Sequence, residues 1–123
     1  MTPTGTTAWH LPRGYAALDA FLGDRKTRRL CNNTHVDRFD IYEERIVVTL
    51  HATRIVTFYP DGRIVLNSGG YRTSTTKARM NAILPDGLRV TQTDFEWTVG
   101  GVAFEDNMTI NSCGLVSLPS ERF

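Results

Sequence analysis

The chain has 123 residues, of which 14 are basic and 13 acidic, so its formal net charge is +1. This length predicts one domain that buries a single modest core without metal or disulfide staples. The near balance of charge argues against a protein that coats nucleic acid in general, for which a strong basic excess is usual. Any contact with a polyanion is therefore expected to be local.

The cysteines and the apolar segments argue against several other classes. Cys31 and Cys113 stand in unrelated contexts without Cys-x-x-Cys spacing, so we expect neither a zinc site nor a redox pair, and a reduced intracellular setting. Residues 1–12 hold no apolar core of signal-peptide length, and no stretch approaches the roughly 18 apolar residues of a membrane-spanning helix. We expect neither export nor membrane insertion.

The first elements in chain order are an arm, a helix and a basic cluster. Residues 1–12, rich in threonine and carrying two prolines, predict a flexible arm, and residues 13–123 predict a single domain. Apolar residues recur at helical spacing from Tyr15 to Leu22, and Gly23 is expected to end this helix. The densest basic cluster of the chain follows, with the residues Arg25, Lys26, Arg28 and Arg29.

Beyond the cluster the apolar period changes to two, which indicates strands. Strands are expected at residues 34–39, 45–51, 54–59 and 63–67, followed by a helix at 76–84 and strands at 88–99 and 102–110. Pro60-Asp61-Gly62 and Gly100-Gly101 are expected to form hairpin turns. We therefore predict an α+β fold in which an antiparallel β-sheet of about five to six strands, built from hairpins, packs against one or two short helices.

Residues 67–81 are the most informative stretch, because a glycine pair leads through Tyr71 and Arg72 into four hydroxyl residues and then into the second helix. Thr75 or Thr76 is expected to be the N-cap, since a threonine oxygen accepts an N–H of the first turn. The free N–H groups, the positive end of the helix dipole and the nearby cations predict an anion site that suits phosphate.

This phosphate site is expected to combine hydroxyl and cationic side chains with one aromatic ring that stacks on a base. The residues expected to bind the ligand are Tyr71, Arg72, Thr75, Thr76, Lys77, Arg79 and Arg28. The alternative is an ordinary capped loop with solvated cations, because no G-x-x-x-x-G-K-[ST] or G-x-G-x-x-G motif occurs.

The basic cluster at residues 25–29 also has two interpretations. It is a solvated face balanced by Asp19, Asp24 and Asp37, or it grips phosphate if the fold brings it beside Lys77 and Arg79. The sequence alone leaves this choice open.

His51 carries an enzymatic alternative. On an extended strand His51 and Thr53 share a face with Thr49 and Thr57. This His-x-Thr element resembles half of the paired motif of the two-histidine phosphoesterases, which implies a histidine acid or base and a threonine that holds a phosphoryl oxygen. Only one copy is present, so a symmetric dimer would have to supply the second, and a simply hydrogen-bonded histidine is the competing interpretation.

Other candidate features are interpreted structurally. The carboxylates of residues 37–44 predict a solvated hairpin end rather than a metal site, and neither a metal nor a cofactor is expected. Phe95 and Trp97 are expected to share one strand face and to lie in the core. Tyr71, beside the glycine pair, is the better candidate for base stacking.

Several segments resemble a known family when they are taken together. They are, in order, residues 30–33, 50–53 with Leu-His-Ala-Thr, 56–62 with Thr-Phe-Tyr-Pro-Asp-Gly, 66–70 with Leu-Asn-Ser-Gly-Gly, and 75–81 with Thr-Thr-Lys-Ala-Arg-Met-Asn. This set resembles a family of small bacteriophage proteins that is common in phages of actinobacteria. The resemblance covers roughly residues 23–85 and implies a viral origin and action in the cytoplasm of the infected cell.

The resemblance also bears on function, because small phage proteins of this kind include accessories of DNA metabolism and inhibitors of host defence, some of which sequester nucleotide signals. The sequence therefore favours a phage accessory protein that binds a phosphate-bearing ligand without catalysis. The ligand is a nucleotide-derived immune signal or a short single-stranded nucleic acid. The alternatives are a phosphodiesterase that uses His51 and Thr53 across a homo-oligomer, and a protein-binding inhibitor of a host enzyme.

Overall fold

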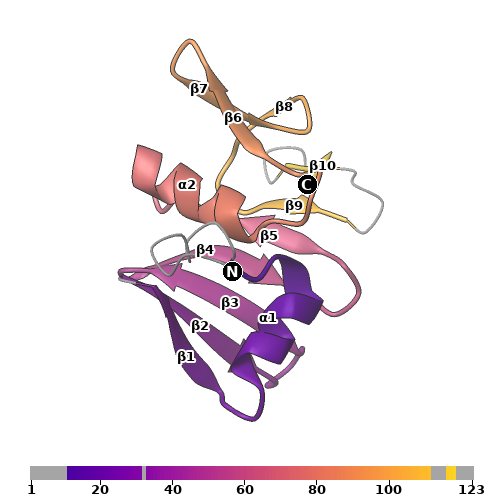
Figure 1. Cartoon of the computed structure of the whole chain (residues 1–123). Helices are drawn as coiled ribbons and strands as arrows, with labels where there is room; N and C mark the ends of the chain where they lie inside the picture. The colour runs from indigo at the N-terminus through magenta and orange to yellow at the C-terminus, as the bar shows by residue number, and fades with distance from the viewer. Residues whose placement is uncertain (1–10, 32, 112–115, 119–123) are drawn as a thin grey trace.

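The fold consists of two antiparallel sheets and two helices (Figure 1). The computed structural model describes residues 11–31, 33–111 and 116–118. In chain order its elements are α1 (Gly14–Leu22), β1 (Thr27–Cys31), β2 (Thr34–Phe39), β3 (Arg45–Leu50), β4 (Thr53–Phe58), β5 (Ile64–Leu66), α2 (Ser74–Ile83), β6 (Val90–Thr93), β7 (Glu96–Val99), β8 (Val102–Ala103), β9 (Met108–Ile110) and β10 (Val116–Ser117). The predicted α+β class is confirmed.

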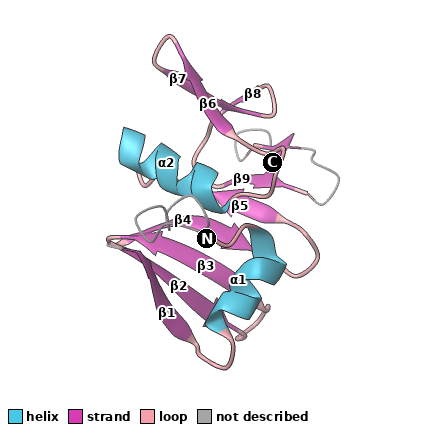
Figure 2. Ribbon diagram, viewed as in Figure 1, coloured by secondary structure: helices cyan, strands magenta, loops and turns pink. Residues whose placement is uncertain are grey.

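The larger sheet has seven strands in the order β1-β2-β3-β4-β5-β9-β10, with every neighbouring pair antiparallel. Its first five strands follow one another along the chain. The chain then passes through α2 and the three-stranded sheet β6-β7-β8 before β9 returns to pair with β5. Figure 2 shows both helices over one face of the large sheet, where α1 contacts β2 and β3, and α2 contacts β4.

A row of apolar residues across the large sheet forms the centre of the core. Val36, Val48, Val56, Leu66 and Met108 are successive cross-strand partners on five strands, and each is fully buried. Because successive residues of a strand point to opposite faces, this register turns a single apolar face toward the helices. Burial of each such side chain contributes about 1.5 to 3 kcal/mol relative to exposure.

The two helices cover this core on one face of the large sheet. The helix α1 contributes Leu18 and Leu22, and α2 contributes Met80 and Ile83, all of which are buried in the same cluster. Gly23 ends α1 as predicted, with φ of 58° and its N–H donated to the carbonyl of Asp19 at 3.0 Å. Neither of the described helices is both long enough and apolar enough to cross a membrane.

Three predictions about the elements are wrong. No strand was predicted in the basic cluster, but residues 27–31 form the edge strand β1, because β2 offers them an antiparallel partner. Residues 88–99 are not one strand but the hairpin β6–β7, and residues 102–110 divide into β8 and β9. Phe95 lies at the tip of that hairpin with 94% of its side chain exposed, and only Trp97 of the expected core pair is buried.

Two predictions fall on residues that the structure does not describe. Of the arm expected at residues 1–12, only Leu11 and Pro12 are described, and Cys113 also lies outside the described ranges.

The backbone geometry confirms the hairpin turn predicted at Gly100 and Gly101. Gly100 and Gly101 both have positive φ, at 58° and 80°, which is the geometry of a two-residue hairpin turn.

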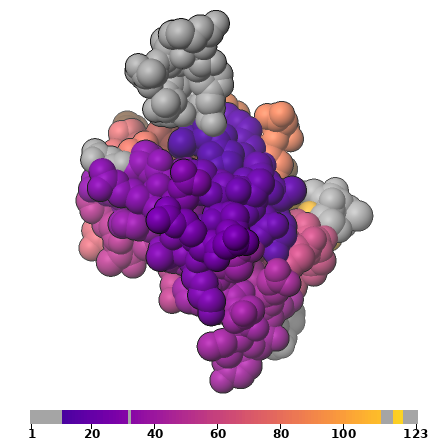
Figure 3. Space-filling model, turned by 60° about the horizontal axis from the view of Figure 1, so that its bottom comes forward, coloured from indigo at the N-terminus to yellow at the C-terminus, as the bar shows by residue number. Residues whose placement is uncertain are grey.

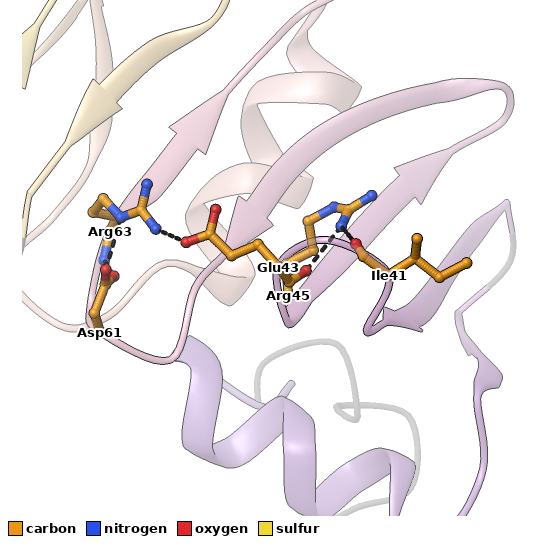
Figure 4. Close-up of polar contacts among 5 residues, drawn as sticks. All are labelled: Ile41, Glu43, Arg45, Asp61 and Arg63. Carbon is orange, nitrogen blue, oxygen red and sulfur yellow. Dashed lines mark hydrogen bonds and ion pairs between the residues drawn. The ribbon is translucent and has the colours of Figure 1, made fainter.

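A polar cluster joins two turns at the end of the large sheet where β3 begins (Figure 4). Arg63 bridges the carboxylates of Asp61 and Glu43, and its Nε donates to Asp61 Oδ2 at 2.8 Å. The backbone N–H and guanidinium of Arg63 hold the pKa of Asp61 below its ordinary value. Arg45 donates to the carbonyls of Ile41 and Glu43 at 3.2 and 2.9 Å. The β2–β3 and β4–β5 turns are thereby tied together.

The tip of the β6–β7 hairpin gives a test of backbone strain. Asp94 and Phe95 form the two-residue turn with φ of 51° and 69°, a conformation that glycine adopts without strain. We expect Phe95→Gly to raise the free energy of unfolding by about 1 kcal/mol, because the exposed ring contributes little burial and a side chain in this conformation costs about that much. Urea denaturation measures the change. Phe95→Ala, which removes the ring but keeps the β-carbon, should show no gain, and an equal gain would refute the strain argument.

The hydroxyl of Tyr15 gives a test of electrostatics at α1. It donates to Glu44 Oε2 at 3.0 Å, and burial together with this carboxylate raises the pKa of Tyr15 from 10.0 to about 12. Because the folded pKa lies above the unfolded one, the associated stability is present below pH 10 and is lost as the pH rises toward 12. Tyr15→Phe should remove the highest step from a tyrosinate absorbance titration. Tyr42→Phe, at a fully exposed side chain, should leave that step in place.

Candidate ligand-binding site

The helix α2 begins earlier than the sequence suggested. Thr73, with φ of −98° and ψ of 164°, is the N-cap, and its Oγ1 accepts the N–H of Thr76 at 3.2 Å. The expectation of a cap at Thr75 or Thr76 is wrong, because the first of the four hydroxyl residues already reaches the third helical N–H. Thr76 is instead buried in the first turn, where its Oγ1 lies 3.1 Å from Thr73 Oγ1.

Two N–H groups of the first turn remain without a partner. The N–H of Thr76 is bonded to the cap, and that of Lys77 donates to the carbonyl of Thr73 at 3.1 Å. For the N–H groups of Ser74 and Thr75 there is no hydrogen bond within the described part of the chain. They stand at the positive end of the helix dipole, so this turn favours an acceptor or an anion.

A cavity of about 560 Å³ lies beside this helix terminus. Its walls come from the β3–β4 hairpin, the loop after β5 and the first turn of α2. The lining residues are Asn33, Leu50, His51, Ala52, Thr53, Ser68, Tyr71, Thr73, Thr75 and Thr76. The cavity thus brings together three of the predicted ligand-binding residues, Tyr71, Thr75 and Thr76, with the pair predicted for the enzymatic alternative, His51 and Thr53.

The loop that forms one wall is held by hydrogen bonds within it and by one distant carboxylate. Ser68 is 1% exposed and donates from both its N–H and its Oγ to Asp106 Oδ1, at 2.8 and 2.7 Å. The N–H of Gly69 donates to Asn67 Oδ1 at 3.1 Å, and the N–H of Gly70 donates to Ser68 Oγ at 3.2 Å. This loop leaves the ring of Tyr71 67% exposed at the cavity, with no ring partner among the described residues.

His51 does not lie on a strand. Strand β3 ends at Leu50 and β4 begins at Thr53, so His51 and Ala52 form the turn, with φ of 55° at His51. The N–H of His51 donates to the carbonyl of Asn33 at 2.8 Å. The expected shared face with Thr49 and Thr57 is therefore wrong, because those two residues lie in the strands and do not line the cavity.

The cations predicted for the site are not at this cavity, whose lining has no lysine, arginine or carboxylate within the described part of the chain. Lys77 and Arg79 instead line a second cavity of about 410 Å³ along α2, which we call the α2 groove. Its lining residues are Leu11, Arg13, Ser74, Lys77, Ala78, Arg79, Asn81, Ala82 and Arg89. The predicted residues are therefore divided between two neighbouring hollows that meet at the first turn of α2.

Arg72 and Arg28 line neither hollow. The guanidinium of Arg72 lies 5.0 Å from the ring centroid of Phe104, and that of Arg28 lies 4.2 Å from the ring centroid of Phe21. Arg28 also donates to the carbonyl of Phe21 at 2.6 Å. These contacts use both side chains to pack the surface rather than to form a site.

The basic cluster lies on and beside the edge strand β1, where the guanidinium of Arg28 contacts the ring of Phe21 in α1. None of its residues lines either hollow of α2. In the space-filling view of Figure 3, the indigo and purple segment that includes α1, β1 and β2 forms most of the visible surface. The condition under which the cluster would grip phosphate beside Lys77 and Arg79 is therefore not met. No group of three or more possible metal ligands occurs among the residues that the structure describes.

Sequence reasoning missed Ser68 and Thr73 as parts of the cavity, and Arg13 and Arg89 as parts of the α2 groove. For Thr73 a signal was present, because it is the first of four successive hydroxyl residues before an apolar helix pattern. For Arg13 and Arg89 there was none. They lie outside α2 in the sequence and reach it only through the tertiary fold.

The comparisons with known proteins give a family but no relative of known structure. A family model described as Kyanoviridae Gp96 protein matches residues 15–113. The chain belongs to this family, which is a family of bacteriophage proteins. No curated protein and no solved structure matches the chain. The phage origin implied by the sequence resemblance is confirmed, whereas an actinobacterial host and the value of the individual motifs stay predictions.

The glycine pair of the cavity wall gives a test with a built-in control. Gly69 and Gly70 both have positive φ, but a β-carbon on Gly69 would lie 2.7 Å from Thr53 Cγ2, whereas one on Gly70 meets nothing within 4 Å. We expect Gly70→Ala to cost roughly 1 to 2 kcal/mol of stability through backbone strain alone. Gly69→Ala should cost about 1 to 3 kcal/mol more, because overpacking adds to the strain. Chemical denaturation of both variants measures the difference, and equal losses would contradict the close packing of this loop on Thr53.

Proposed function

We propose that this phage protein is an accessory factor that binds a phosphate-bearing ligand without turning it over. The observation that carries the proposal is the cavity beside the N-terminus of α2, where two unpartnered N–H groups meet a ring of hydroxyl side chains. Its volume of about 560 Å³ lies within the range of small-molecule sites. A phosphoryl group accepts hydrogen bonds from such donors, and the helix dipole favours its negative charge.

The cavity also suits the rest of a nucleotide. The ring of Tyr71 is exposed at the cavity and is available to stack on a base, an interaction that tolerates any base because each has a π-face. Thr53 and Thr75 add hydroxyl groups on two sides of the lining. Lys77 and Arg79, one turn further along α2, raise the local positive potential without entering the cavity.

The biological role that fits this ligand class is capture of a nucleotide-derived signal or of a short single-stranded nucleic acid inside the infected cell. Membership of a phage protein family supports a role in an infected cell, and the link to immune signalling is part of the proposal. A homo-oligomer and a host protein partner are further parts of the proposal. Each follows from the phage context rather than from a contact in the fold.

A second candidate is a phosphodiesterase, because the fold places His51 and Thr53 at the same cavity as the α2 terminus. His51 is exposed in its turn and would act as general acid or base beside a bound phosphoryl group. Among the residues that the structure describes, no second histidine lines the cavity. The paired mechanism therefore needs a second copy of the chain, and binding without catalysis is the better supported function.

A thermal-shift screen against nucleotides, cyclic dinucleotides and ADP-ribose derivatives tests the binding proposal. A ligand that binds only the folded protein at 100 times its Kd stabilises it by about 2.7 kcal/mol, which corresponds to a rise of several degrees in Tm. We expect Tyr71→Ala and Thr75→Val to abolish this rise. Tyr42→Ala, at a fully exposed tyrosine outside the cavity, is the matched control and should retain it. If no compound shifts the Tm and a host protein co-purifies instead, the protein is an inhibitor that binds protein.

The same ligands separate binding from catalysis. After prolonged incubation with cyclic and linear phosphodiesters, we expect chromatography to recover the ligand unchanged. Product formation that disappears in His51→Ala while the thermal shift remains would replace the binding proposal with the phosphodiesterase.

A further inference from the structure

The α2 groove concentrates positive charge from three separate segments of the chain. Arg13 precedes α1, Lys77 and Arg79 lie on α2, and Arg89 precedes β6. All four side chains line one hollow of about 410 Å³, whose lining includes no carboxylate. The whole chain has a formal net charge of only +1, so this gathering is local.

The charges in the groove are hydrogen-bonded but not neutralised. Lys77 donates to Gln92 Oε1 at 2.9 Å, and Arg79 donates to Thr34 Oγ1 at 3.1 Å, which are both uncharged acceptors. Within the described ranges, neither these two side chains nor Arg89 forms an ion pair. Arg13 donates to the carbonyls of Asn81 and Leu84 at 2.8 and 3.1 Å, and within the described ranges its ion pair is with the exposed Asp86, at 3.9 Å from its Nε.

Two arginines outside the groove form ion pairs with carboxylates that neutralise their charge. Arg38 is paired with Asp19, and Arg63 is paired with both Asp61 and Glu43. The groove instead gathers four like charges in one concave surface, where only Arg13 has a carboxylate partner among the described residues. Such a hollow focuses its field on an incoming polyanion.

The groove and the 560 Å³ cavity share the first turn of α2. Ser74 lines the groove, whereas Thr73, Thr75 and Thr76 line the cavity. A phosphate held at the terminus of α2 is therefore adjacent to both hollows. A ligand with one base in the neutral cavity and further phosphates running along α2 would use the hydroxyls, the ring of Tyr71 and the cations together.

We propose that the α2 groove binds the sugar–phosphate backbone of a single-stranded oligonucleotide, one nucleotide of which occupies the cavity. The proposal rests on the proposed function and narrows its ligand to a chain of nucleotides rather than one small signal. A single strand is required, because a base must be unpaired and unstacked to enter the cavity and stack on Tyr71. The four cations supply the electrostatic contact that tracks a strand's phosphates.

Equilibrium binding of thymidine 5′-monophosphate and of oligothymidylates of increasing length tests this inference, with salt varied for each ligand. We expect affinity to rise from one nucleotide to about four, because the strand then reaches the cations of the groove. Arg89→Gln should lower oligonucleotide affinity about tenfold at low salt, flatten the salt dependence and leave mononucleotide affinity unchanged. Arg29→Gln removes the same charge at an exposed residue that lines neither hollow, and it should change neither.

The outcomes separate this inference from the function on which it rests. Mononucleotide binding without length dependence, or equal effects of Arg89→Gln and Arg29→Gln, overturns the role of the groove and leaves the cavity as the site. Absence of binding by all of the thymidylates overturns this inference, and the proposed function is overturned as well only when the thermal-shift screen finds no ligand. Competition by polyglutamate as effective as that by an oligonucleotide of equal charge overturns nucleic acid as the occupant. Oligonucleotide binding that Tyr71→Ala leaves unchanged overturns the shared use of groove and cavity.

Discussion

The contact on which the candidate site depends is the pair of hydrogen bonds from Ser68 to Asp106. Both the N–H and the hydroxyl of this buried serine donate to one carboxylate oxygen from the chain segment before β9. The same crossing includes the N–H of Asn107, which donates to the carbonyl of Leu66 at 2.7 Å. One local arrangement therefore fixes both the loop that walls the cavity and the place where β9 joins β5. A charged acceptor strengthens such bonds and makes the loss of either partner costly.

This constraint explains why the cavity exists at all. Gly69, which follows Ser68, approaches Thr53 too closely for a β-carbon, so the loop packs tightly against the β3–β4 hairpin. The chain then turns into α2 with its first N–H groups directed to the same region. The strand end, the loop and the helix terminus therefore lie together around the cavity. Ser68 fixes the loop by its hydrogen bond to Asp106, Gly69 allows close packing on the hairpin, and Thr73 caps the helix.

Much of the fold follows from local pattern. The strand predicted at residues 34–39 has the bounds of β2, and its first residues alternate, with Thr34 and Val36 buried and His35 exposed. The turn at Gly100 and Gly101 was predictable from residue type. The tip at Asp94 and Phe95 was not, since phenylalanine rarely adopts the positive φ that both central positions of such a turn require. The edge strand β1 was missed because its own residues are mostly polar and exposed, and only pairing with β2 makes them extended.

The candidate site was predictable only where its residues are close in sequence. Tyr71, Thr75 and Thr76 lie within one stretch, and the fold keeps them at one cavity. The separation of Lys77 from that cavity follows from helical geometry, since residues one and two positions apart on a helix face different directions. The gathering of Arg13 and Arg89 beside α2 depends on how α1 and β6 are placed in three dimensions. No spacing in the sequence encodes it.

The direct pairing of β5 with β9 has an evolutionary consequence. The stretch between these strands leaves the large sheet and returns to the position next to its exit, and Val65 and Thr109 are partners across that junction. Lengthening or shortening the β6–β7 tip shifts no register in the large sheet, because loop closure costs little and the tip is outside the pairing. Descendants of this chain are thus free to vary this tip while inheriting an unaltered frame, whereas Val90, Trp97 and Val99 of the same hairpin are packed in the core.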